Sequence, residues 1–330
     1  MNVFELTRQL IAIQSISGDE KDVALFLEEY LSGAGFDVEL QWVERNRPNV
    51  YARRGDPRVV MSTHTDTVPP YIEFSEDEEF IYGRGACDAK GTIAAMTKAA
   101  ESLIESGATD IGLLFVIGEE AGSPGARAAN MIANRSRYLI NGEPTESKIA
   151  LGSKGALRCH LKAEGRAAHS AYPEMGESAI DKLLEALADL SRAPFPEDPV
   201  LGATTMNIGT IKGGVAANVI AAEAEAELMF RVVTGAGSLM QIIEEAIHGR
   251  ARVEYTFACD PVFMESLEGF ETAVVSFTTD IPLLTGWGKP LLFGPGSILD
   301  AHTAHEKIGK VELARAVASY VEIAGRLLKP

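Results

Sequence analysis

The sequence predicts an α/β protein in which a mostly parallel sheet, with helices on both faces, is interrupted by a smaller α+β domain. Its 330 residues exceed the size of one ordinary domain, so two domains are expected. Helical and strand patterns alternate in the first half of the chain, whereas a β-α-β-β-α-β order follows from about residue 154. We therefore expect one domain at residues 1–153 and 264–330, and an inserted domain at residues 154–263.

The elements of the first domain follow from apolar spacing. Residues 20–35 carry an apolar helical stripe that ends at a glycine. Residues 58–64 and 111–117 are short apolar runs typical of buried strands, and residues 90–107 between them have helical spacing. Three elements are expected after the insertion: a helix near residues 269–286, a short strand over 290–294 and a final helix over 310–328.

The inserted domain has six expected elements: strand 156–165, helix 177–190, strand 203–214, strand 222–233, helix 236–249 and strand 251–258. In the strand at 222–233, small or apolar residues alternate with Glu223, Glu225 and Glu227, as expected for a sheet with one face in water. This order of elements is that of the ferredoxin-like split unit.

Composition argues against several classes of function. The formal net charge of −17 repels phosphate backbones and anionic membranes, so we expect no nucleic-acid or membrane partner. No segment approaches the ~18 apolar residues of a membrane span, and the apolar run at residues 10–13 is too short for a signal peptide. The three cysteines form no close pair, which favours a cytoplasmic location over a disulfide framework.

Five segments place an acid or a histidine just past a strand or in a glycine-rich turn. They are residues 62–67, 82–91, 116–123, 140–145 and 301–306. Ligands of open α/β sheets bind at the carboxyl ends of the strands, so these segments are candidates to line one crevice. Asp66 lies two residues after His64, faces the same way in an extended chain and can orient the imidazole.

Each of these residues alone also has a simpler interpretation. His64 could be an ordinary histidine at a strand end, and Asp88 could cap the following helix. Glu143, His302 and His305 could be solvated loop residues. Taken together, they suit two divalent cations that share one carboxylate and need five ligands. The set that supplies them is His64, Asp88, one of Glu119 or Glu120, Glu143 and His302. Imidazole and carboxylate donors without a thiolate pair favour zinc, cobalt or manganese.

Eight motifs in order, spanning residues 62–306, carry a resemblance to a known family. They are "HTDT", "GRGACDAKG", "GEEAGSPGA", "NGEPT", "GRAAHSAYPEMGESAI", "GGVAANVI", "FRVVTG" and "AHTAHE". The chain resembles the zinc aminoacylase and carboxypeptidase metallopeptidases, which include acetylornithine deacetylase, succinyl-diaminopimelate desuccinylase and glutamate carboxypeptidase. The resemblance implies a di-zinc peptidase domain with an inserted lid and dimerisation domain, and a homodimer formed through that lid.

The resemblance also implies roles for individual residues. One metal is expected on His64, Asp88 and Glu143, and the other on Asp88, Glu120 and His302. Two Zn²⁺ ions are expected, with Co²⁺ or Mn²⁺ as alternatives. The expected catalytic residues are Glu119 as general base, Asp66 beside His64, and His169 as an oxyanion donor from the partner subunit's lid. The expected substrate contacts are Arg231 on a substrate carboxylate, with further hydrogen bonds from Asn218 and Gly296.

The implied reaction is removal of an acetyl or succinyl group from an N-acyl amino acid. Water shared by the two metals would lose a proton to Glu119, and the resulting hydroxide would attack the amide. A dipeptidase or carboxypeptidase is the alternative within the same chemistry. A non-catalytic binding relative would be expected to lack the base or a ligand, and a di-metal phosphodiesterase is disfavoured by the acidic charge.

Overall fold

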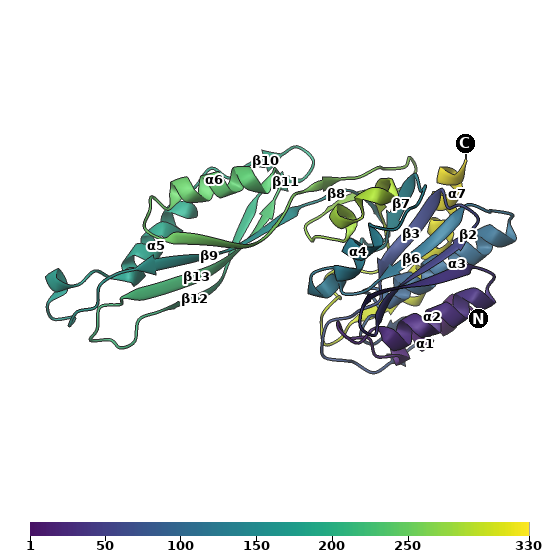
Figure 1. Ribbon diagram of the computed structural model, residues 1–330, viewed down its shortest axis with the longest axis horizontal. Coiled ribbons are helices and arrows are strands. Elements are labelled where there is room, and N and C mark those ends of the chain that lie inside the picture. Colours follow the sequence, from purple (N-terminus) through teal and green to yellow (C-terminus); the bar gives the residue numbers. More distant parts are fainter. Residues whose placement is uncertain (330) are drawn as a thin grey trace. The chain divides into compact units, whose positions relative to one another are not determined.

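The computed structural model describes residues 1–329, which form two compact units (Figure 1). The first unit contains Met1–Leu151, Met264–Ala273 and the described residues from Thr279 onward, and the second contains Gly152–Phe263 and Val274–Thr278. The expected boundaries were 153/154 and 263/264. The functions that the sequence assigns to the two domains remain predictions.

A six-stranded mixed sheet forms the centre of the first unit, with the strand order β1-β2-β6-β3-β7-β17. Its parallel part consists of β6 (Ile111–Val116), β3 (Val59–His64), β7 (Tyr138–Asn141) and β17 (Lys289–Leu292). At the other edge, β1 (Asp37–Glu44) and β2 (Arg47–Arg54) form an antiparallel hairpin that pairs with β6. The mostly parallel sheet is confirmed, whereas the β1–β2 hairpin was not predicted from the sequence.

Helices cover both faces of this sheet, as expected. On one face lie α1 (Val3–Ala12), α2 (Lys21–Gly33), α3 (Lys90–Glu105) and α7 (Lys310–Leu328), whose apolar residues form one core with the strands. On the other face, α4 (Pro124–Ala129) and Trp287 pack against strand residues such as Val60 and Leu114. Within residues 1–329, none of the helices combines the length and the apolar character that a membrane crossing requires.

The prediction of a helix near residues 269–286 is wrong. The chain there forms strand β16 (Thr272–Val275) and two short 3₁₀ turns, η3 (Ile281–Leu283) and η4 (Thr285–Trp287). The β-branched residues of β16 favour extended backbone, and Pro282 has no N–H to donate within a helix. The chain also forms two small three-stranded sheets. One consists of β15 (Val262–Phe263), β8 (Ile149–Ser153) and β16, and the other of β18 (Lys307–Gly309), β5 (Phe80–Tyr82) and β4 (Ser75–Glu76).

The second unit is a four-stranded antiparallel sheet with two helices on one face. The strands are β9 (Gly155–Glu164), β12 (Thr205–Gly213), β13 (Glu223–Val232) and β14 (Arg252–Cys259), in the order β12-β13-β9-β14. The helices are α5 (Ala179–Leu190) and α6 (Ala236–Ala246). Together with the chain order, this confirms the ferredoxin-like arrangement. A short ribbon of β10 (Glu197–Asp198) and β11 (Gly202–Ala203) is attached to it.

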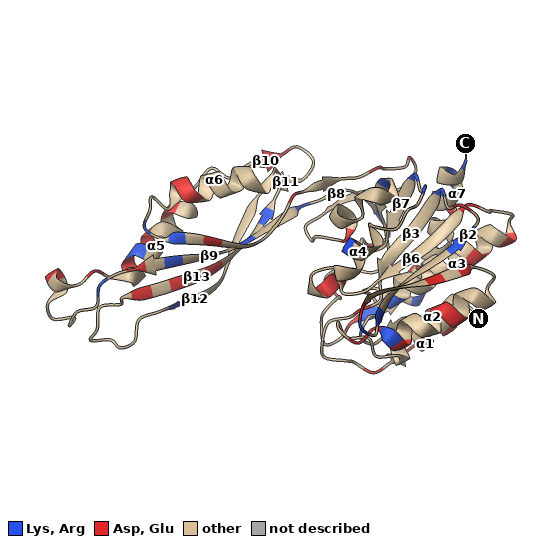
Figure 2. Cartoon of the chain, viewed as in Figure 1, with Lys and Arg blue, Asp and Glu red and all other residues tan. Residues whose placement is uncertain are grey.

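Strand β13 shows why its sequence alternates. Ala224, Ala226 and Leu228 are buried beneath the helices, whereas the intervening glutamates lie on the opposite, open face. Figure 2 shows the acidic bands along this strand. The period of two places Glu223, Glu225 and Glu227 together on the face that is open to water.

Candidate metal centre

Three of the five predicted ligands lie at the ends of neighbouring parallel strands. His64 is the last residue of β3, Glu119 and Glu120 begin the turn η1 (Glu119–Ala121) after β6, and Glu143 follows β7 by two residues. Because β6, β3 and β7 are adjacent and parallel, their carboxyl ends meet at one edge of the sheet. Gly118 allows the turn after β6, since its φ is +71° and a Cβ there would lie 2.8 Å from Pro124.

Three groups of these residues have potential ligand atoms within 4.8 Å of one another, and one of them is His64, Glu119 and Glu120. The other two match the expected metal sites: one is His64, Asp88 and Glu143, and the other is Asp88, Glu120 and His302. Asp88 belongs to both, and its two oxygens face different histidines: Oδ1 lies 2.9 Å from His64 Nε2, and Oδ2 lies 3.2 Å from His302 Nε2. The alternative interpretation of Asp88 as a helix cap is not supported, because α3 has Ala89 at its N-cap and no side-chain cap.

The predicted ligands are mostly acidic, and the histidines carry part of the balancing positive charge. Burial alone would lower the pKa of His64, but hydrogen bonds with Asp66 and Asp88 outweigh it and hold that pKa well above its usual value. Hydrogen bonds with Asp88 and Glu120 raise the pKa of His302 to about 10. Burial and the negative charge of Asp88 raise the pKa of Glu143 well above its usual range. The cluster therefore favours bound positive charge.

The donor set fits divalent cations. Glu143 Oε1 is buried and has no hydrogen-bond partner within the described chain, which is costly for a carboxylate unless a cation satisfies it. Imidazole and carboxylate donors are ligands that zinc, cobalt and manganese accept. A bound cation would also require the histidines to lose their protons, so metal and protons would compete for this site.

Asp66 fixes both His64 and the turn that carries the two glutamates. The imidazole Nδ1 lies 2.9 Å from the main-chain oxygen of Asp66, closer than the 3.5 Å to its carboxylate. The carboxylate instead accepts hydrogen bonds from the main-chain N–H groups of Glu119 and Glu120, at 3.0 and 3.2 Å, and from the Ser17 hydroxyl at 2.7 Å. The expected link between Asp66 and His64 thus runs mainly through the main chain.

Glu119 differs from Glu120 in its surroundings. Glu120 Oε1 lies 2.6 Å from His302 Nε2, whereas the potential ligand group that contains Glu119 consists of His64, Glu119 and Glu120. Removal from water and the negative charge of Asp280 raise the pKa of Glu119 well above its usual range. A carboxylate with a raised pKa is suited to accept and release a proton near neutral pH.

Two buried acids near these groups were not predicted as site residues from the sequence. Asp280 is 1% exposed, and burial raises its pKa to about 6. Glu306, also 1% exposed, was noted only as a neighbour of His302 in the last motif. Asp280 stands alone between Thr279 and Ile281 and had no motif to single it out. The position of Asp280 near these groups results from the folding of the whole chain.

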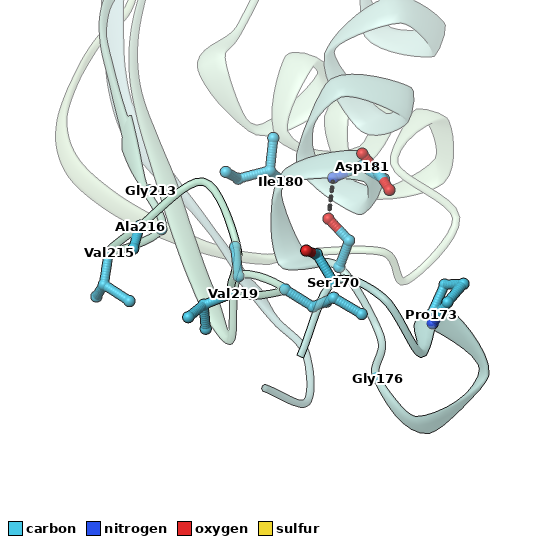
Figure 3. Close-up of a pocket in the computed structure, with 13 residues that line it drawn as sticks. Ser170, Pro173, Gly176, Ile180, Asp181, Gly213, Val215, Ala216 and Val219 are labelled. Carbon is cyan, nitrogen blue, oxygen red and sulfur yellow. Dashed lines mark hydrogen bonds between the residues drawn. The ribbon is translucent and has the colours of Figure 1, made fainter. Parts of the chain in front are cut away.

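Three other predicted residues, His169, Asn218 and Arg231, lie in the second unit. His169 and Asn218 are exposed on two loops that pair with each other: Ser170 N donates to Asn218 O at 3.0 Å, and His169 forms a β-bridge with Val219. These loops line a cavity of about 640 Å³ (Figure 3), where Ser170 and Val219 lie on opposite loops. Arg231 is half-buried on β13 and forms no salt bridge with the described part of the chain.

Gly296 lies in the first unit, and its peptide groups are already paired. Its N–H donates to Glu312 Oε1 at 2.8 Å, and its carbonyl accepts from Glu146 N at 2.8 Å. With φ at +86° and a Cβ position only 2.5 Å from Cys87 Sγ, glycine is needed here for packing. The cysteine is buried and its thiol contacts the main-chain oxygen of Ser297, so Cys87 is engaged in the same packing.

Comparison with known proteins shows which families and proteins this chain resembles. Residues 151–255 match the family described as "Peptidase dimerisation domain", and residues 49–154 match "Peptidase family M28". The chain is 39% identical to a peptidase M20 domain-containing protein of Schizosaccharomyces pombe, over 97% of this chain and 83% of that protein. It is 38% identical to a probable carboxypeptidase of Aspergillus flavus, over 95% of this chain and 87% of that protein.

The fold is shared with solved structures. A tripeptidase from Staphylococcus aureus superposes with a TM-score of 0.83 at 20% sequence identity, covering 99% of this chain and 98% of that one. At this identity the likeness concerns the fold alone.

Proposed function

The chain belongs to the peptidase M20 family, and from this premise we propose that it hydrolyses an amide bond beside a free carboxylate, as a carboxypeptidase or dipeptidase. It is a metal-dependent hydrolase that acts on amide bonds. The proposal concerns the substrate, the metals and the roles of individual residues.

One observation carries the proposal: the two oxygens of Asp88 face two separate groups of potential ligands. We assign His64 and Glu143 to one divalent cation, Glu120 and His302 to the other, and Asp88 to both. Zinc fits this donor set, and cobalt or manganese are the alternatives. Two such cations would lower the pKa of a water molecule and polarise the carbonyl of the scissile amide.

Glu119 is assigned as the general base. It accepts the proton of the attacking water and passes it to the leaving amine. Asp66 supports this role, because its carboxylate holds the main chain of Glu119 and Glu120 and so fixes the direction in which the two side chains point. Each glutamate then has one task, since Glu120 is turned toward His302.

The second unit is proposed to contact the substrate. His169 Nδ1 accepts a hydrogen bond from Ala171 N at 3.1 Å, so the neutral ring carries its proton on Nε2 and can donate it to an oxyanion. The half-buried guanidinium of Arg231, with no salt bridge in the described chain, is suited to a substrate carboxylate. Asn218 adds a polar group on the loop that pairs with His169. The match to a dimerisation domain supports a homodimer in which His169 serves the partner's site.

N-acetyl and N-succinyl amino acids form a second proposed substrate class. They present the same amide beside a carboxylate, and the motif resemblance to acetylornithine deacetylase favours them. The curated relatives named as probable carboxypeptidases favour peptides instead. A cytoplasmic location is also part of the proposal, supported by three cysteines that are all free thiols.

An assay of released amine tests the proposal. Purified protein is loaded separately with Zn²⁺, Co²⁺ or Mn²⁺ and given dipeptides, blocked peptides with a free C-terminus, and N-acetyl and N-succinyl amino acids. We expect hydrolysis that a chelator abolishes, and little hydrolysis when the substrate carboxylate is amidated. Equal rates on the amidated substrates would contradict the proposed role of the carboxylate.

A further inference from the structure

A buried ion pair lies beside the proposed metal ligands, but the mechanism above does not use it. Arg84 Nη1 donates to Glu306 Oε2 at 2.6 Å, and the two side chains are at most 2% exposed. Arg84 Nε also donates to the main-chain oxygen of Pro70 at 3.1 Å. Desolvating two charges is expensive, so such a pair is weak evidence of a purely stabilising role.

The second oxygen of Glu306 is directed at the main chain of a proposed ligand. Glu306 Oε1 accepts hydrogen bonds from the N–H groups of Cys87 and Asp88, each at 3.1 Å. In addition, Gly83 N donates to the main-chain oxygen of Glu306 at 3.1 Å. Glu306 therefore contacts the segment of residues 83–88 with both its side chain and its backbone.

Glu306 also lies four residues after His302. Its contacts join the segment that carries His302 to the segment that carries Asp88, although the two lie more than 200 positions apart in the chain. Asp66 makes the same kind of contact elsewhere in the unit, because its carboxylate accepts the main-chain N–H groups of Glu119 and Glu120. In both places a buried carboxylate that is not itself an assigned ligand holds the backbone of one that is: Asp66 holds Glu120, and Glu306 holds Asp88.

We propose that Glu306 is a positioning residue of the metal centre, whose carboxylate holds the main chain of Asp88 in register with His302 while Arg84 supplies the counter-charge. This inference rests on the proposed function, since Asp88 is the ligand assigned to both cations. A shift of the Asp88 backbone would misplace both oxygens at once, so loss of the contact weakens both metal sites together.

The test must separate positioning from stability. Removing Glu306 alone leaves Arg84 buried without a counter-charge, which destabilises the fold whatever else it does. Replacing both residues, Arg84→Met with Glu306→Met, removes the two charges together and roughly conserves volume. Such replacements of buried ion pairs are often neutral or stabilising. The N–H groups of Cys87 and Asp88 nevertheless lose their acceptor in this double variant.

Two measurements are made on the double variant and the unchanged protein. A titration with Zn²⁺ alone, in competition with a chromophoric chelator, is expected to show about 10- to 100-fold weaker binding in the variant, as for other groups that orient metal ligands. Hydrogen exchange of the metal-free protein is expected to be faster at the amides of Cys87 and Asp88. A second double variant, Arg84→Met with Glu306→Gln, keeps an acceptor for these amides and is expected to restore both properties.

Glu20→Gln is the matched control. Glu20 is a fully buried acid that pairs with Arg47 at 2.6 Å and accepts Gly18 N at 3.0 Å, without touching the main chain of a ligand. The Glu20→Gln substitution is expected to lower the thermal stability of the protein and to leave its Zn²⁺ affinity unchanged.

Wild-type Zn²⁺ affinity and unchanged amide exchange in the double-methionine variant would overturn the inference. An equal loss of affinity in the control would also overturn it. If the unchanged protein bound no divalent ion, the proposed function would fail, and the exchange measurement would still decide whether Glu306 holds the backbone of Asp88.

Discussion

The two units of the molecule treat charged side chains in opposite ways. The first unit buries acids such as Asp66, Asp88 and Glu306 together with bases such as Arg84. In the second unit, Lys154 is the one buried charged residue among those described, and the open face of the sheet carries its acids in water. Burial in the first unit is costly, and hydrogen bonds or bound cations must compensate for it.

This difference in burial indicates that the two units have different tasks. In the first unit the groups proposed for chemistry are held before any substrate arrives, as the contacts of Asp66 with Glu119 and Glu120 illustrate. In the second unit His169 and Asn218 are exposed, and Arg231 has no ionic partner in the described chain. We interpret the first as a pre-organised reaction centre and the second as a surface that a substrate completes.

Among the substitutions proposed here, Asp88→Ala should disturb the reaction centre of the first unit most strongly. In the Asp88→Ala variant both cations lose a ligand, so we expect bound metal to fall below one ion per chain and turnover to fall to background. Metal analysis after gel filtration and the amine-release assay measure the two effects. Asp37→Ala, which removes an exposed carboxylate paired with Arg53, is the control and should change neither. Full metal content in Asp88→Ala would contradict a shared ligand.

Glu119→Gln tests the base without removing a proposed ligand. The amide cannot accept the proton of the attacking water, so kcat should fall by about 10²- to 10⁴-fold. Zn²⁺ content should remain that of the unchanged protein, because Glu120 and not Glu119 faces His302. Near-normal turnover in this variant would show that another group acts as base, with buried Asp280 as the next candidate.

A substitution in the second unit should have a smaller effect and leave the metals in place. We expect His169→Ala to lower kcat by about 10²- to 10³-fold through loss of an oxyanion donor. Mixing His169→Ala with Glu119→Gln under conditions of subunit exchange tests the proposed homodimer. Activity above that of both parents is expected if His169 serves the partner's site. No recovery despite demonstrated exchange would place His169 in the site of its own subunit.

The smallest expected effect is a pH dependence of the metal-free protein. Hydrogen bonds with Asp88 and Glu120 raise the pKa of His302 to about 10, above the usual value near 6.5. A group with a raised folded-state pKa contributes stability fully below its unfolded pKa, and the contribution is lost as the pH rises toward about 10. The stability advantage of the unchanged protein over His302→Gln should therefore shrink between pH 7 and 10.

Thermal melting of both metal-free proteins measures this difference. Burial lowers the pKa of Lys90 to about 7, which favours folding as the pH rises and opposes the trend of His302. Comparing each pH with the His302→Gln variant removes the contribution of Lys90, because both proteins retain it. A stability difference that stays constant from pH 7 to 10 would contradict the ion pairs assigned to His302.

Local pattern sufficed for much of the fold. Apolar runs predicted β3 and β6, and the period of two in β13 and the order of elements predicted the ferredoxin-like unit. The β1–β2 hairpin was not predicted, and residues 269–286, where a helix is expected from the sequence, form β16 and two 3₁₀ turns. In both segments tertiary pairing decided between states that local pattern left close in energy.

The sequence by itself determined which residues stand at strand ends and turns, because backbone period and glycine conformation are local properties. His64, Glu119, Glu120 and Glu143 could be named in this way. Only the tertiary structure decided how the groups pair: that Asp66 holds the turn of the two glutamates, that Glu306 holds Asp88, and that Asp280 is buried. Burial and hydrogen bonding between distant segments depend on the packing of the whole unit, and no spacing along the chain encodes them.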